Sequence, residues 1–153
     1  MYLASKGLSK AYCVDNPLQD PEHGGAFNVI STFFLVILVS DFYEWGWHRL
    51  GHVIPHCWNV HKHHHVFFNP SPFAVIADEW ADQLVRAFPL LLFPLITPIN
   101  MDIMFFTYGL FFYAYGVYLH WGYESNLIDA HNGIINTAYH HYAHHVNKKT
   151  ETV

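Results

Sequence analysis

The chain has 153 residues, which is enough for one domain, and 52% of its residues are hydrophobic whereas 12% are charged. Soluble domains typically contain about 25% charged residues, so this composition favours a membrane protein. A formal net charge of −5 excludes the basic surface that nucleic-acid binding needs, and two cysteines are too few for a disulfide framework.

The chain begins with a polar segment, residues 1–25, and the first apolar segment follows at residues 26–47. This apolar run is long enough to cross the bilayer core, which is about 30 Å thick and takes roughly 20 helical residues. Asp41 and Glu44 lie in its last turns, where contact with lipid would be costly, so we expect them to face protein or an aqueous interface. We predict one membrane-embedded domain over residues 26–153.

Two further apolar segments follow at residues 84–99 and 103–121, with turn-forming residues between them. Pro89 and Pro94 interrupt the first of these segments, so we expect it to be kinked or tilted. A pair of segments joined by a short turn enters and leaves the membrane on the same side. Residues 48–83 and 120–153 are therefore predicted to lie on one face of the membrane.

The basic residues predict which face this is. Because lysines and arginines are enriched in cytoplasmic loops, the face with more of them is expected to be cytosolic. Only Lys6 and Lys10 lie in the opposite segment. The other five basic residues lie on the predicted common face: Arg49, Lys62, Arg86, Lys148 and Lys149.

Histidine is the most unusual component, with 14 in the chain, and all but His23 fall within residues 48–65 and 120–145. Three short motifs contain most of them. On a helix, residues three and four apart project from one face, so each motif is expected to present two or three imidazoles toward a common point. The motifs are HRLGH (His48, His52), HKHHH (His61, His64, His65) and HHYAHH (His141, His144, His145).

Eight imidazoles are enough for two metal ions, because a structural zinc takes four ligands and a catalytic zinc takes three with a water. Imidazole suits zinc, iron, copper and nickel, so the ligand type leaves the metal open. The position at the ends of membrane segments favours iron and O2 chemistry on a lipid C–H bond. A zinc-binding membrane protein or a transporter is the alternative, although transporters place ionisable ligands near mid-span.

The stretches WHRLGH, HKHHHVFFNPSPF and NTAYHHYAHH resemble the three histidine boxes of the fatty acid hydroxylase/sterol desaturase superfamily. The stretch NPSPFA is similar to the matching segment of sterol C5-desaturases (lathosterol oxidases). The resemblance runs from about Asp41 to His145. It implies an all-α integral membrane helical bundle with a cytosolic non-haem di-iron site, mostly found in the endoplasmic reticulum. Members of this family typically continue well past the third box and often have another membrane segment before the first, so we expect either a partial sequence or an unusual packing of the remaining helices.

The resemblance also implies which histidines bind iron, including His120 in YLHWGYE. His140 lies beside the third box and is a candidate for contact with a ligand. We expect no metal-binding role for His56, His63 and His131. The implied ligands are His48, His52, His61, His64, His65, His120, His141, His144 and His145.

Metal-bound histidines usually donate their other ring N–H to a carboxylate or carbonyl. We rank Asp41 and Glu44 first for this role, because they lie seven and four residues before His48 and burial near the bilayer requires a partner for each. Other carboxylates lie close to the boxes in sequence and remain open for the same role: Asp78, Glu79, Asp82, Glu124 and Asp129.

The resemblance implies O2-dependent desaturation or hydroxylation of a membrane lipid, with a sterol as the first expectation. The alternative within this chemistry is hydroxylation or cleavage of fatty acyl or alkylglycerol lipids. The sequence contains neither a glycine-rich dinucleotide motif nor a CxxCH haem attachment motif. Electrons are therefore expected from a partner, which by resemblance is cytochrome b5 or its reductase.

Overall fold

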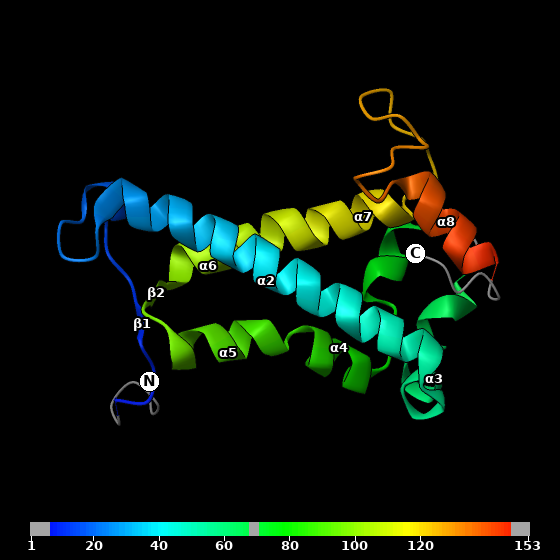
Figure 1. Cartoon of the computed structure of the whole chain (residues 1–153), viewed down its shortest axis with the longest axis horizontal. Coiled ribbons are helices and arrows are strands. Elements are labelled where there is room, and N and C mark those ends of the chain that lie inside the picture. Colours follow the sequence, from blue (N-terminus) through cyan, green and yellow to red (C-terminus); the bar gives the residue numbers. More distant parts are fainter. Residues whose placement is uncertain (1–6, 68–70, 148–153) are drawn as a thin grey trace. The chain divides into compact units, whose positions relative to one another are not determined.

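The computed structural model describes residues 7–67 and 71–147, and these residues are mostly helical (Figure 1). The helical content confirms the all-α prediction. Within the described residues, two short strands, β1 (Ala11–Tyr12) and β2 (Ile99–Asn100), form a parallel pair. Several residues used in the sequence analysis lie outside the described residues: Lys6, Asn69, Pro70, Lys148 and Lys149.

The chain divides into two compact units. The first comprises residues up to Trp45 together with Val85–Phe111, and the second comprises Gly46–Leu84 together with residues from Phe112 onward. Three helical elements continue across these boundaries, namely α2, α4 and η4. The predicted division into a polar segment over 1–25 and one membrane-embedded domain over 26–153 stays a prediction.

Helix α2 (Gly25–Val53) is the longest element of the described chain, and glycine and proline explain its ends. Gly24 and Gly25 have φ angles of +90° and +53°, and a Cβ on Gly25 would lie 2.9 Å from the Leu18 carbonyl oxygen. Only glycine fits that position without strain. Ile54 ends the helix in an extended conformation, as expected for a residue that precedes a proline. The predicted segment 26–47 is therefore part of a longer helix that includes the first histidine box.

The first unit contains the N-terminal part of α2, the 3-10 turn η1 (Pro17–Gln19), α5 (Phe88–Ile96), α6 (Met101–Thr107) and the start of the π-helical η4 (Tyr108–Tyr113). Two tyrosine hydroxyls of this unit hydrogen-bond to the backbone of residues 85 and 86. The Tyr43 hydroxyl donates to the Val85 carbonyl and the Tyr108 hydroxyl donates to the Arg86 carbonyl, each at 2.9 Å. The buried apolar residues of this unit are Val36, Phe93, Ile99, Met104 and Tyr108.

Helix α2 has the length and surface expected of a membrane-crossing helix. It is the one helix among the described residues that is long and apolar enough to cross a membrane, and only 17% of its most apolar window is buried. The apolar helix of a soluble core would be mostly buried. Instead, large apolar side chains of α2 are open, such as Phe27, Leu38 and Phe42 with 79%, 65% and 70% exposure.

The other two apolar segments form different structures. The segment predicted over 84–99 contains the short helix α5, which has Pro94 in its interior. The segment predicted over 103–121 forms an uninterrupted helical stretch, in which α6, η4 and α7 (Ala114–His120) follow one another. That the two segments enter and leave a membrane on one side stays a prediction.

The second unit contains the end of α2, α3 (Pro55–His61), η2 (His64–Val66), η3 (Pro72–Ile76), most of α4 (Trp80–Arg86), α7 and α8 (Ala138–Val146). Helix α7 packs against η3 and α8. Gly116 permits the first contact, because a Cβ there would lie 2.5 Å from Cγ2 of Val75. All the histidines of the three boxes belong to this unit.

Candidate metal centre

Ends of helices and one tight turn hold the box histidines of the second unit. His48 and His52 lie one turn apart near the end of α2, and His120 is the last residue of α7. The second box is divided, because His61 ends α3 whereas the other two histidines lie in the 3-10 turn η2. The third box lies within α8, whose N-cap residue Thr137 accepts a backbone hydrogen bond from the first turn. A common helix for the second box was therefore a wrong expectation.

Eight of the predicted ligands form two groups of four, and in each group the nitrogens available to a metal lie within 4.8 Å of one another. In the first group, the Nε2 atoms of His61 and His65 are 3.2 Å apart. In the second, the Nε2 atom of His120 lies 3.3 Å from that of His64 and 2.9 Å from that of His141. We call them the His48 group (His48, His52, His61 and His65) and the His64 group (His64, His120, His141 and His145).

His144 is the ninth predicted ligand, and it lies against the His48 group. Its Nε2 atom is 2.8 Å from Nε2 of His48. Its ring centroid is 4.6 Å from that of His52 and 4.8 Å from that of His65. The structure therefore places eight of the nine predicted ligands in the two groups, and the ninth in direct contact with one of them.

Each H-x-x-H-H box contributes histidines to both groups. The second box contributes two to the His48 group and one to the His64 group, whereas the third box does the reverse. His61 and His65 belong to the His48 group whereas His64 belongs to the His64 group. In the third box, His141 and His145 belong to the His64 group, whereas His144 contacts the His48 group. In each of these boxes two imidazoles, and not all three, lie in a common group. Their first and last histidines share a centre, and the middle one faces the other centre.

The spacing of the ring nitrogens fits metal ions. Two nitrogens bound about 2.1 Å from one ion lie about 3.0 Å apart in octahedral and about 3.4 Å apart in tetrahedral geometry. Contacts between Nε2 atoms in the His64 group measure 2.9 to 3.3 Å, which is close to this range. In addition, Nε2 of His52 is buried without a hydrogen-bond partner, although it lies in the His48 group. A metal ion would satisfy such a nitrogen.

Burial and neighbouring imidazoles keep these histidines neutral. Burial, followed by repulsion from His52, lowers the pKa of His144 to about 4. Burial, followed by repulsion from His64, lowers the pKa of His145 to about 2. The pKa values of His65 and His141 also lie below the ordinary value, mainly because of burial. Near neutral pH these four histidines therefore offer unprotonated nitrogens, which is the form that binds metal.

Two buried aspartates contact the outer ring nitrogens of the second box. Asp82 Oδ2 lies 3.1 Å from Nδ1 of His61, which belongs to the His48 group. Asp78 Oδ1 lies 2.7 Å from Nδ1 of His64, which belongs to the His64 group. Both carboxylate side chains are fully buried. Each group therefore has one carboxylate behind one of its histidines, an arrangement that orients metal-bound imidazoles.

The second oxygen of each aspartate accepts a further hydrogen bond. The indole Nε1 of Trp47 donates to Oδ1 of Asp82. The side-chain amide of Gln83 donates to Oδ2 of Asp78 at 2.8 Å. His120 has a backbone acceptor instead, because its Nδ1 lies 2.8 Å from the Gly116 carbonyl oxygen. Acceptors thus hold the outer nitrogens of His61 and His120, whereas the outer nitrogen of His64 lies in contact with a carboxylate.

The carboxylates ranked first from sequence lie in other environments. Asp41 is exposed. Glu44 is paired with Arg86 at 3.0 Å, and both residues belong to the first unit. Sequence reasoning left Asp78 and Asp82 open without ranking them, and Asp78 lies before the start of α4 whereas Asp82 lies within it. Trp47 and Gln83 were missed, since nothing in the sequence pattern marks them.

The histidines without a predicted ligand role lie outside the two groups. His56 and His131 are exposed. The side chain of His63 is 47% exposed and lies 3.7 Å from Glu79. His140 lies beside the ring of His131, at a centroid separation of 6.3 Å.

One glycine permits the close approach of two box elements. A Cβ on Gly51 would lie 2.9 Å from Cγ of His61. This distance is shorter than atoms in contact tolerate, so a side chain there would displace the imidazole. Gly51 lies between the two histidines of HRLGH. The first box therefore contains two candidate ligands, and its glycine leaves room for the ring of a third, His61.

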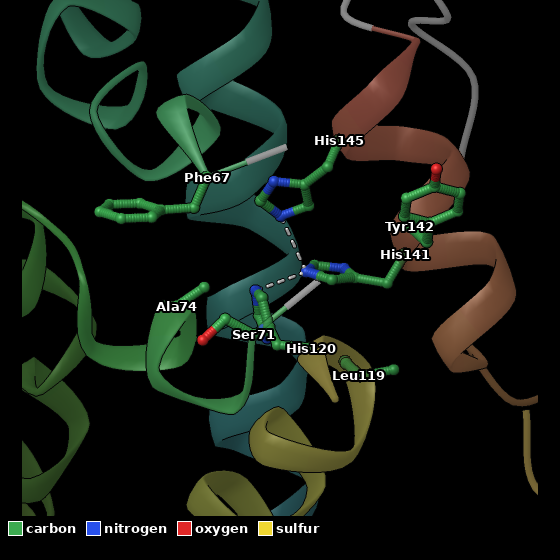
Figure 2. A pocket seen from close by; sticks show the side chains of 8 residues that line it. All are labelled: Phe67, Ser71, Ala74, Leu119, His120, His141, Tyr142 and His145. Atoms are coloured by element: carbon green, nitrogen blue, oxygen red, sulfur yellow. Dashed lines mark hydrogen bonds between the residues drawn. The ribbon is translucent and has the colours of Figure 1, made fainter. Parts of the chain in front are cut away.

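A pocket lies beside the His64 group (Figure 2). In Figure 2, the rings of His120, His141 and His145 point toward one another from α7 and α8. No residue of the His48 group lines this pocket. The remaining lining residues are mostly apolar or aromatic: Phe67, Ser71, Ala74, Leu119 and Tyr142.

Comparison with known proteins gives the family of this chain. The model of the fatty acid hydroxylase family matches residues 33–152, which include both histidine groups. The chain belongs to the fatty acid hydroxylase family. This result confirms the resemblance seen in the three histidine boxes. No solved structure matches this member of the family.

Curated relatives of this family member are sterol desaturases. The Delta(7)-sterol 5(6)-desaturase erg32 of Schizosaccharomyces pombe is 32% identical over 126 residues, which cover 80% of this chain and 36% of the relative. A second such desaturase of that organism, erg31, is 33% identical over 73% of this chain and 36% of its own length. The Delta(7)-sterol 5(6)-desaturase ERG3B of Gibberella zeae is 29% identical, over 82% of this chain and 38% of the relative. The chain thus spans little more than a third of these curated relatives.

Proposed function

We propose that this chain forms the metal-binding part of a membrane enzyme that oxidises a lipid with O2. Membership of the fatty acid hydroxylase family supports the reaction class. The observation that carries the proposal is the convergence of nine histidines on two adjacent groups. A single-metal zinc protein would need only one group of four.

The two groups would hold one iron ion each. The His48 group with His144 would bind the first, and the His64 group would bind the second. Bound iron supplies the activation of O2 for attack on an unactivated C–H bond. Zinc fits the same nitrogens and would be expected to replace iron in some preparations.

The protein's own residues would orient the metals and admit the substrate. Asp82 and Asp78 hold the rings of His61 and His64 from behind. The pocket beside the His64 group has largely apolar walls, including Leu119. Such walls favour a small apolar molecule such as O2 over water. The substrate carbon would then approach the metals from this side, next to the His64 group.

A sterol is the proposed substrate, and desaturation is the proposed outcome. The support comes from the relatives, which are named Delta(7)-sterol 5(6)-desaturases. The long apolar surface of α2 is suited to a protein that meets its substrate within a membrane. We place this membrane in the endoplasmic reticulum, with the histidine groups on its cytosolic side. Two electrons for each O2 would come from a partner such as cytochrome b5 or its reductase.

Complementation tests this function. The full-length gene is expressed in a yeast strain that lacks its sterol C5-desaturase, and the sterols are profiled. Restored 5,6-unsaturation is expected, and the matched control is the same gene with His64→Ala, which should restore nothing. Unchanged sterols together with a new hydroxylated acyl lipid would contradict the sterol assignment and favour the acyl-lipid alternative.

A further inference from the structure

We propose that Asp82 and Asp78 are positioning residues for separate metal centres, and that asparagine can replace Asp78 but not Asp82. The inference rests on the two metal sites of the proposed function and concerns the residues behind them. One difference between the neighbours of the two carboxylates leads to this inference. The second hydrogen-bond partner of Asp82 can only donate, whereas that of Asp78 can also accept.

Asp82 must accept from two donors. Its Oδ1 accepts from the indole N–H of Trp47, and its Oδ2 lies 3.1 Å from Nδ1 of His61. The Nε2 of His61 points into the His48 group, so its proton must lie on Nδ1 when a metal is bound. Indole nitrogen is a donor only. Asparagine has one oxygen and one NH2 group, so at this position one N–H would face another N–H.

This mismatch cannot be relieved by water, because the site is closed. The Asp82 side chain is fully buried, and the side chain of His61 is only 4% exposed. Rotating the asparagine amide only moves the mismatch from His61 to Trp47. Asp82→Asn should therefore release His61 from its orientation, and the effect should be confined to the His48 group.

Asp78 also lies between two side chains, one in contact and one hydrogen-bonded, but its second partner is adaptable. Its Oδ1 lies 2.7 Å from Nδ1 of His64, and its Oδ2 accepts from the side-chain amide of Gln83. A glutamine amide carries both a donor and an acceptor. If Asp78 becomes asparagine, Gln83 can turn its amide by half a turn and accept from the new NH2 group. The asparagine oxygen then remains available to His64.

Both substitutions remove one negative charge next to a metal ligand, so that loss is common to the two variants. Changes in residues that contact a metal ligand typically reduce metal affinity by about 10–100-fold. We expect Asp82→Asn to reach the upper part of that range at one centre, about 100-fold. We expect Asp78→Asn to remain near the lower limit, about tenfold, at the other centre. The difference between them measures the donor mismatch.

The experiment measures metal binding, separately from turnover. Full-length protein is purified from membranes, loaded with Fe(II), and titrated with a chelator while iron content and the iron spectrum are followed. Asp82→Asn should lose one of two irons at a lower chelator concentration than Asp78→Asn. Glu79→Gln is the matched control, because Glu79 is 43% exposed and its loss of charge should leave both irons bound.

A double variant tests the cause and covers the case in which Asp82→Asn does not fold. Trp47→Phe removes the donor-only partner, so in combination with Asp82→Asn the asparagine oxygen can serve His61. We expect this double variant to retain its iron about as well as Asp78→Asn. Equal iron loss in Asp82→Asn and Asp78→Asn, or no recovery in the double variant, would overturn the inference. If the unchanged protein binds fewer than two irons, the proposed function itself fails.

Discussion

The His48 group and the His64 group contain the same kind of ligand but have different surroundings. The His48 group is built on the end of α2, and Trp47 of the same helix holds its carboxylate. The His64 group is built from η2, α7 and α8, and three of its histidines line the pocket. The comparison teaches that two chemically alike histidine groups differ in what lies behind and beside them. Under the proposed function, the substrate would approach the group that lines the pocket.

The largest expected effect is on turnover, when one ligand is removed from each group in turn. His64→Ala and His61→Ala should each reduce turnover by more than about 100-fold, because even residues that only contact a ligand cost about 10–100-fold. His63→Ala is the control between them in sequence, and it should retain activity because its side chain points to solvent. Product formation in membranes measures all three. Full activity of His64→Ala would refute the assignment of the second box.

Acid should destabilise the metal-free protein through both groups. The pKa values of His144 and His145 are lowered to about 4 and about 2, so below pH 6.5 the unfolded chain binds more protons than the folded one. Stability should be constant above about pH 6.5 and fall toward lower pH, by up to about 1.4 kcal/mol per pH unit for each proton. Thermal unfolding between pH 7 and pH 4 measures this. A melting temperature that rises on acidification would contradict it.

A small substitution in α2 should affect the His48 group alone. Gly51→Ala places a Cβ against the ring of His61, and overpacking of this kind typically costs about 1–3 kcal/mol. Gly46→Ala is a matched control in the same helix, since a Cβ at residue 46 meets no atom within 4 Å. The control should be neutral or stabilising by up to about 1 kcal/mol. The melting temperature and iron content of both variants test this prediction. Equal values for the two variants would contradict the close contact between Gly51 and His61.

The smallest effect concerns the acidic residue that the sequence ranked first. Glu44 pairs with Arg86, and the two side chains are 23% and 26% exposed. Glu44→Gln should cost less than about 1 kcal/mol, as is typical of partly exposed ion pairs. Iron content at both groups should not change, in contrast to Asp82→Asn. Loss of one iron in Glu44→Gln would contradict this and would support the sequence-based ranking of Glu44 as a carboxylate behind a metal ligand.

The spacing of the boxes predicted which histidines come together, because i, i+3 and i+4 relations depend only on local backbone geometry. It did not predict how they divide. The chain leaves α3 at His61 and enters a 3-10 turn, so His64 faces a different centre from its neighbour His65. A change of helix type within five residues leaves no periodic signal in the sequence.

The partners of the carboxylates could not be predicted for a related reason. Glu44 required a partner, and the sequence did not show that Arg86, 42 residues away, supplies it. Likewise, Asp82 contacts Trp47 across 35 residues. Such pairs depend on tertiary packing, which the spacing of residues within one segment does not contain.

The metal content of the purified full-length protein tests the central claim most directly. The claim is that two histidine groups hold two ions. Elemental analysis of protein prepared with iron should find two irons per chain, falling to one in both His61→Ala and His64→Ala. A single zinc per chain with no iron, or two irons retained in both variants, would contradict the account.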